Sequence, residues 1–278
     1  MPVAAINGVE LHWELSGEEG APVVLVHGSW GDHSTWDRIV PALAPSMRVL
    51  TYDRRGHSRS ERPAMQGSVR EDVADLAALI EHLNLAPAHI LGGSFGGSIV
   101  LRLAAERPDL FRSLLVHEPP LFGVLEDPAA RKVLQIFQER VHVVIELLEE
   151  GRMEDGARRF VETIAFGPGA WEQLPGELRQ TFIFNAPTFL DEQRDPEWLL
   201  INLQALANFP APALLTQGTQ SETFFPLVVE KIAQFLPHSQ RQTLPGADHV
   251  PQLSRPEEYV EAILSFIRAV AGAGLSRA

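Results

Sequence analysis

The chain has 278 residues, of which 45% are hydrophobic and 21% charged, and its formal net charge is −13. This is the composition of an ordinary globular protein, and its acidity repels phosphate backbones, so we expect no nucleic-acid partner. Because the chain contains no cysteine, disulfides, thiolate metal sites and cysteine nucleophiles are excluded.

No segment of the sequence has the properties of a secretory signal or a membrane span. The N-terminal residues lack a basic stretch followed by an apolar run. No apolar run approaches the ~18 residues that cross a bilayer. We therefore expect a cytoplasmic protein with no membrane partner, while the oligomeric state is not indicated.

Strand-like and helix-like segments alternate in the first part of the chain. Apolar side chains recur at helical spacing in residues 69–83, and a second helix, residues 95–106, stops before Pro108. The strands that we expect here are residues 11–16, 23–27, 48–53, 89–93 and 111–117. This alternation favours a mostly parallel sheet covered by helices, the α/β class.

The pattern changes in the middle of the chain. From about residue 127 to residue 208 the spacing of apolar residues is helical throughout, and the strand–helix alternation resumes at 213–217. We therefore predict an α/β core made of residues 1–121 and 209–278. A helical cap, residues 122–208, would interrupt this core.

Residues 92–96 read Gly-Gly-Ser-Phe-Gly and match the pattern G-x-S-x-G. The serine, Ser94, falls between an expected strand and an expected helix, which is the context that a nucleophile elbow requires. Small residues must flank the serine in so tight a turn, and the helix N-terminus favours negative charge there. A glycine-rich turn without chemistry would share the pattern, but in this context we predict that Ser94 is a nucleophile.

A serine nucleophile needs further groups around it. It needs a base at neutral pH, and in chains with such an elbow the acid and then the histidine follow the serine. His249 fits, because it lies in a loop after the last expected strand. A tetrahedral intermediate also needs an oxyanion hole of two backbone N–H groups. We expect these from Phe95, directly after the nucleophile, and from Ser29, in the loop after the strand at 23–27.

Two glutamates compete for the role of the acid that orients His249. In the loop after the strand at 213–217 the only carboxylate is Glu222, which would equally suit the first turn of the next helix. Glu118 ends the strand at 111–117 among apolar residues and prolines. A carboxylate there is costly to bury unless it is paired, and His249 is a natural partner. We favour Glu118, with Glu222 as the alternative acid.

Taken together, these motifs resemble the α/β-hydrolase superfamily. They are His27-Gly28, the segment Asp53-Arg54-Arg55-Gly56-His57-Ser58, the elbow at Ser94 and the Gly-x-x-His loop that ends at His249. The resemblance covers both core segments and implies an α/β-hydrolase fold. In that family residues 53–58 form a structural turn near the pocket, so we assign them no catalytic role.

A closer resemblance is to the zearalenone lactonase group. It is carried by His117-Glu118-Pro119-Pro120, by residues 219–225 and by Leu244-Pro245-Gly246 followed by a histidine. That group uses a serine, a histidine and a glutamate after this same strand, which implies Glu118 and suggests lactone hydrolysis. Its elbow serine is followed by another small residue, whereas this chain has Phe95.

The sequence therefore predicts a hydrolase without metal or cofactor that cleaves a hydrophobic ester or lactone through an acyl-enzyme. Ser94, His249 and Glu118 would form its triad. Large aromatic residues, most of them in the cap, would line an apolar substrate pocket: Trp30, Trp171, Phe182, Phe184 and Trp198. Two alternatives remain open: a carbon–carbon bond hydrolase of a ring-cleavage product, and a non-catalytic receptor for small molecules with the same fold.

Overall fold

The computed structural model describes residues 2–63 and 68–275. Within them, eight strands form one sheet in the order β1-β2-β4-β3-β5-β6-β7-β8. Strand β2 is antiparallel to β1 and β4, and the strands from β4 to β8 in this order are parallel. The bounds are Val3–Ile6 (β1), Val9–Ser16 (β2), Ala21–Val26 (β3), Met47–Tyr52 (β4), Ala88–Gly93 (β5), Phe111–His117 (β6), Ala213–Gly218 (β7) and Ser239–Leu244 (β8).

Helices cover both faces of the sheet because its central strands are apolar on both sides. In β3, Val24 and Val26 join the cluster formed with helices α2, α3 and α9, whereas Val23 and Leu25 pack with α1 and α11. These helices span Val69–His82 (α2), Phe95–Glu106 (α3), Phe225–Ala233 (α9), Val40–Leu43 (α1) and Pro256–Leu275 (α11). Strands buried on both faces are typical of parallel sheets, and the predicted α/β class is confirmed.

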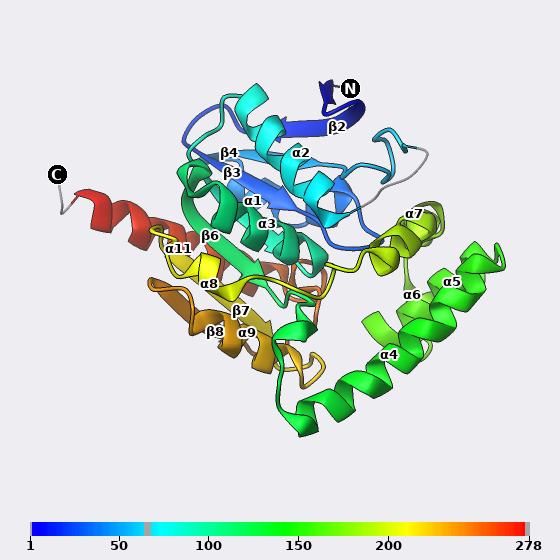
Figure 1. Cartoon of the computed structure of the whole chain (residues 1–278). Coiled ribbons are helices and arrows are strands. Elements are labelled where there is room, and N and C mark those ends of the chain that lie inside the picture. Colours follow the sequence, from blue (N-terminus) through cyan, green and yellow to red (C-terminus); the bar gives the residue numbers. More distant parts are fainter. Residues whose placement is uncertain (1, 64–67, 276–278) are drawn as a thin grey trace.

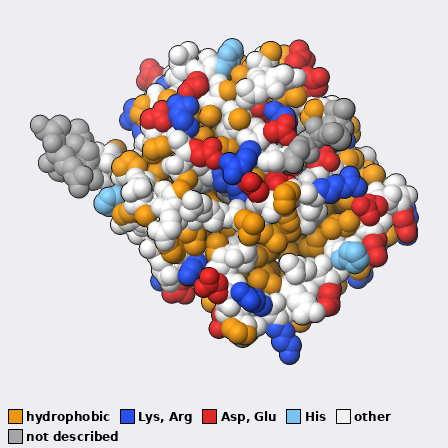
Figure 2. Space-filling model, in the orientation of Figure 1, with side chains coloured by type: hydrophobic (Ala, Val, Ile, Leu, Met, Phe, Trp, Pro, Cys, Tyr) orange, Lys and Arg blue, Asp and Glu red, His pale blue; other side chains and the backbone are white. Residues whose placement is uncertain are grey.

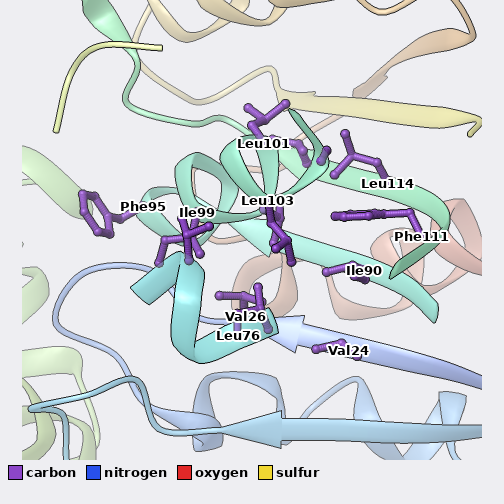
Figure 3. Packing of buried hydrophobic residues seen from close by; sticks show 14 of the residues in the cluster. Val24, Val26, Leu76, Ile90, Phe95, Ile99, Leu101, Leu103, Phe111 and Leu114 are labelled. Atoms are coloured by element: carbon purple, nitrogen blue, oxygen red, sulfur yellow. The ribbon is translucent and has the colours of Figure 1, made fainter. Parts of the chain in front are cut away.

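Helix α3 is fixed to the sheet by fully buried side chains. Figure 3 shows Ile99 and Leu103 of α3 beside Val26 of β3 and Ile90 of β5, and none of the four is exposed to solvent. Close packing of this kind leaves little freedom for the helix to shift. The residue that precedes α3, Ser94, is therefore held in a constant place at the end of β5.

Helices α4 to α7, which we call the cap, form a separate unit between β6 and β7 (Figure 1). They span Pro128–Glu149 (α4), Met153–Phe160 (α5), Ala170–Gln173 (α6) and Gly176–Arg194 (α7), with a π-helical turn at Val161–Ala165. They share their own apolar cluster, which includes Val144, Phe182 and Phe189. At the ends of the predicted range 122–208, the turn Phe122–Val124 (η3) and helix α8 (Leu203–Leu206) pack on the core instead.

The remaining short elements lie in loops of the core. They are the 3-10 turns His33–Trp36 (η1) and Pro108–Leu110 (η2) and the helical turn Pro251–Ser254 (α10). None of the helices in residues 2–63 and 68–275 combines the length and the hydrophobicity needed to cross a membrane.

Candidate active site

Ser94 occupies a strained turn between β5 and α3. Its φ and ψ angles are 53° and −124°, a combination that costs energy for a residue with a side chain. The flanking glycines are required by close backbone contacts. A Cβ atom on Gly96 would lie 2.2 Å from the carbonyl oxygen of Val26, and one on Gly92 would lie 2.3 Å from that of Gly96. The G-x-S-x-G pattern is therefore explained by the geometry of an elbow.

The structure brings together the three residues that the sequence analysis favoured for a triad. His249 Nε2 lies 2.9 Å from Ser94 Oγ, and His249 Nδ1 lies 2.8 Å from Glu118 Oε2. Because an ionised carboxylate only accepts hydrogen bonds, Nδ1 carries the proton and donates a hydrogen bond to Glu118. Nε2 is then free to accept the proton of the Ser94 hydroxyl, as a general base must.

Glu118 is fully buried, with 0% of its surface exposed, and both of its carboxylate oxygens are bonded. Oε1 accepts a hydrogen bond of 2.7 Å from the backbone N–H of Gly218, and Oε2 accepts the bond from His249. Burial by itself would raise the pKa of Glu118, but the hydrogen bonds from His249 and from the Gly218 N–H help to outweigh burial and lower it. The side chain is therefore a carboxylate at neutral pH.

Glu222, the alternative acid, lies elsewhere. Its Oε1 atom forms an ion pair of 3.1 Å with Arg140 Nη1 of the cap, and its side chain is 42% exposed. The position opposite Nδ1 of His249 is taken by Glu118. The geometry thus supports Glu118 over Glu222 as the partner of His249.

His117 is a buried histidine next to this arrangement that the sequence analysis left without a role. Its Nδ1 atom is 2.9 Å from Thr216 Oγ1, and its Nε2 atom is 3.6 Å from Glu118 Oε2. Burial lowers the pKa of His117 to about 4, so the ring is neutral at neutral pH. A histidine directly before a candidate acid is the signal that the sequence offered.

The loop after β3 lies against the nucleophile. A Cβ atom on Gly28 would lie 3.0 Å from the Cβ of Ser94, so this backbone passes close to the serine. Ser29 and Phe95 both line the cavity that contains Ser94. Both residues expected to form the oxyanion hole therefore lie at this cavity, and the role of their backbone N–H groups stays a prediction.

Ser94 and His249 open into a cavity of about 530 Å³ between the core and the cap. On the face shown in Figure 2, hydrophobic side chains gather where the cap meets the core. The ring of Phe225 stacks on the imidazole of His249 at a centroid distance of 4.4 Å. The lining also includes Phe122, Phe137, Phe160, Phe182, Phe189 and Trp198. The space suits a largely apolar small molecule.

Two of the five predicted pocket residues, Phe182 and Trp198, line this cavity, and the other three do not. Trp30 and Trp171 are buried in the apolar cluster of the cap, where Trp30 stacks on Phe160 at 4.7 Å. Phe184 is 58% exposed and lies beside Arg62 on the surface. The prediction for these three residues is corrected, because their rings pack inside the cap or face solvent.

Comparison with known proteins identifies the fold family of this chain. Residues 21–256 match the alpha/beta hydrolase fold family. The pimeloyl-[acyl-carrier protein] methyl ester esterase of Photobacterium profundum is 28% identical over 275 residues, which cover 93% of this chain and 98% of that protein. A segment of 112 residues, 40% of this chain, is 41% identical to the dihydrolipoyllysine-residue acetyltransferase component of the acetoin cleaving system of Pseudomonas putida, but it spans only 30% of that protein.

A solved structure gives the same result at the level of the whole fold. The alpha/beta hydrolase from Sphaerobacter thermophilus superposes with a TM-score of 0.77 and 25% sequence identity, over 96% of this chain and 100% of that one. The family match covers strands β3 to β8, the elbow at Ser94 and the loop of His249. The chain therefore belongs to the α/β-hydrolase family and is a hydrolase.

Proposed function

We propose that the protein cleaves a hydrophobic carboxylic ester or lactone through an acyl-enzyme, with Ser94 as nucleophile, His249 as base and Glu118 as the orienting acid. The observation that carries this proposal is the continuous hydrogen-bonded series from Ser94 Oγ through His249 to Glu118, at 2.9 Å and 2.8 Å, at the floor of an apolar cavity. The relative from Photobacterium profundum, named as a methyl ester esterase, supports an ester as the substrate.

The proposed reaction follows from the geometry of the three side chains. His249 Nε2 takes the proton from Ser94 Oγ while the oxygen attacks the substrate carbonyl carbon. The oxyanion that forms would accept hydrogen bonds from the backbone N–H groups of Ser29 and Phe95. When the intermediate collapses, His249 returns the proton to the leaving alkoxide, and a water molecule then repeats the sequence to release the acid. Glu118 stabilises the imidazolium in both halves.

The lining of the cavity favours a bulky, uncharged substrate. Apolar surface contributes about 25 cal/mol per Å² when it is buried, so an aryl ring can add a few kcal/mol to transition-state binding. Among the described residues, Arg38 is the arginine that lines the cavity. Its Nη1 atom donates a hydrogen bond to the carbonyl oxygen of Leu253. A substrate with a free carboxylate would also meet Asp37, Glu177 and Asp248 in the same lining, and like charges repel.

We expect an aryl ester of an aromatic acid to be turned over with a kcat/KM at least 10–100 times that of ethyl acetate, because only the larger substrate fills the cavity. In the variant Phe182→Ala this ratio should fall severalfold, since the Phe182 ring lines the cavity. Steady-state kinetics on both esters would measure the ratio.

Phe184→Ala provides a matched control, because Phe184 lies on the same helix two residues away and is exposed. That variant should keep the ratio of the wild type. Equal rates for the two esters in the wild type would contradict the proposed substrate class. Cleavage of a vinylogous 1,5-diketone without any ester turnover would replace the proposal with carbon–carbon bond hydrolysis, and no turnover of either would favour a receptor.

A further inference from the structure

The loop that carries one of the proposed oxyanion donors is bonded to a single helix of the cap. The Ser29 hydroxyl donates a hydrogen bond to Glu192 Oε2 of α7. Asn185, two turns earlier on α7, donates from Nδ2 to the carbonyl oxygens of Trp30 at 3.2 Å and Gly31 at 2.9 Å. Trp30 has a φ of 67°, which is unusual for a residue with a side chain, so these bonds hold a strained loop.

Glu192 connects this loop to a buried arginine. It is 4% exposed, and its second carboxylate oxygen, Oε1, accepts hydrogen bonds of 3.0 Å from both Nη1 and Nη2 of Arg54. Arg54 is fully buried and also binds Asp72 through Nε at 3.0 Å and Nη2 at 3.1 Å. The guanidinium is thus fixed between two carboxylates, one from the core and one from the cap.

Arg54 in turn fixes the peptide unit that joins Gly28 to Ser29. Its Nη1 atom donates to the carbonyl oxygen of Gly28 at 3.3 Å, and His27 Nδ1 donates to the same oxygen at 2.9 Å. In a planar trans peptide the carbonyl and the N–H of the next residue point in opposite directions. Holding the Gly28 carbonyl on the arginine side therefore also sets the direction of the Ser29 N–H.

We propose that Glu192 is a positioning residue for the oxyanion hole: it holds the Ser29 hydroxyl and the Arg54 guanidinium, and through them it orients the Gly28–Ser29 peptide. The inference rests on the proposed function, because it assigns the Ser29 N–H to the oxyanion. Helix α7 of the cap is then part of the arrangement that stabilises the transition state. A displacement of α7 would slow the chemical step as well as change access to the cavity.

The variant Glu192→Gln tests this directly. Ser29 and Arg54 donate to different carboxylate oxygens, and an amide replaces one of these oxygens with an NH2 group. The variant therefore loses the hydrogen bond from one of the two donors, together with the charge that pairs with Arg54. We expect kcat to fall about 10–100-fold with KM changed less than threefold, because an oxyanion hole acts mainly in the transition state. The affinity of an aryl boronic acid, whose tetrahedral adduct on Ser94 places an oxygen in the hole, should fall by a similar factor.

Asp191→Asn is the matched control, since it removes the same charge from the neighbouring residue of α7, which is not bonded to this loop in the described structure. It should leave kcat and boronate affinity within threefold of the wild type. A Glu192→Gln enzyme with raised KM but unchanged kcat and boronate affinity would overturn the positioning role. If the wild type neither hydrolyses esters nor reacts with a fluorophosphonate, the proposed function itself fails, and the two failures are distinguishable.

Ser29→Ala keeps the inference testable if Glu192→Gln does not fold, because it removes one hydrogen bond and leaves the buried charges and the backbone N–H in place. We expect a loss of about 3–10-fold in kcat with KM nearly unchanged. Wild-type kcat in Ser29→Ala would contradict the role of this hydroxyl. In a folded double variant, Ser29→Ala should add less than its own separate loss to that of Glu192→Gln, since both changes affect the hydrogen bond between Ser29 and Glu192. Fully additive losses would also contradict the inference.

Discussion

Replacing Ser94 with alanine is expected to lower kcat by about 10⁶-fold and to abolish covalent labelling by a fluorophosphonate. The reason is that no other hydroxyl is bonded to His249 in the described structure, so the base has nothing to activate. Alanine keeps a Cβ at the strained elbow and changes little else, so the melting temperature should change by only a few degrees. Ester kinetics, intact-protein mass spectrometry after labelling and a thermal melt would measure the three quantities.

Ser34 provides a control for this experiment within the same cavity. Its hydroxyl lines the space but donates to Asp32 instead of to a histidine. Ser34→Ala should therefore keep stoichiometric labelling at Ser94. Persistent stoichiometric labelling of Ser94→Ala would move the nucleophile to another residue and would remove the basis of the proposed mechanism.

The parts of the site that could be predicted from the sequence are those with a local geometric requirement. The elbow needs small residues on both sides of Ser94, and the structure shows the backbone contacts, at Gly92 and Gly96, that impose this need. Glu118 could be selected because a carboxylate at the end of an apolar strand must find a partner. The alternation of strand and helix likewise defined the α/β core, since it reflects periodicities of the backbone itself.

The pocket residues of the cap could not be selected in this way. Phe182 and Phe184 are two positions apart on α7, and at 100° per residue they face nearly opposite directions. The sequence places both in an aromatic-rich helix, but which side faces the cavity depends on how the cap docks. The prediction for Trp30 is wrong for a different reason, because this residue follows β3 of the core but its ring packs into the apolar cluster of the cap.

The burial of polar side chains along α7 could not be predicted from the sequence either. Asn185, Thr188 and Glu192 of α7 and Asp195 at its C-cap recur at helical spacing, and all four are buried against the core. In the sequence, polar residues at such spacing indicate a solvated helix face. They are buried here because the partners lie far away in the chain: Trp30, His57, Arg54 and Val69. Only the tertiary structure pairs these groups, and the role proposed for Glu192 depends on that pairing.

Replacing Glu118 with glutamine is expected to lower kcat by about 10⁴-fold, the loss seen when the aspartate of a serine protease triad becomes asparagine. Glutamine has nearly the same shape, but its amide cannot stabilise the imidazolium. Depending on its orientation, it either presents N–H groups to Nδ1 of His249 or loses the bond from Gly218. Because partners lower the pKa of Glu118 despite its burial, the wild type holds a full negative charge there at neutral pH. The variant loses that charge.

Glu222→Gln is the matched control, since it makes the same chemical change at the competing glutamate, which pairs with Arg140 on the surface. An exposed ion pair is worth about 0–1 kcal/mol, so kcat should stay within a few-fold of the wild type. Both variants should still bind the substrate, because neither glutamate lines the cavity. Glu118→Gln should therefore reduce kcat with little change in KM, as expected for a group that acts in the transition state. The opposite ranking of the two variants in single-turnover measurements would assign the acid to Glu222 and require the loop after β7 to move toward His249 during catalysis.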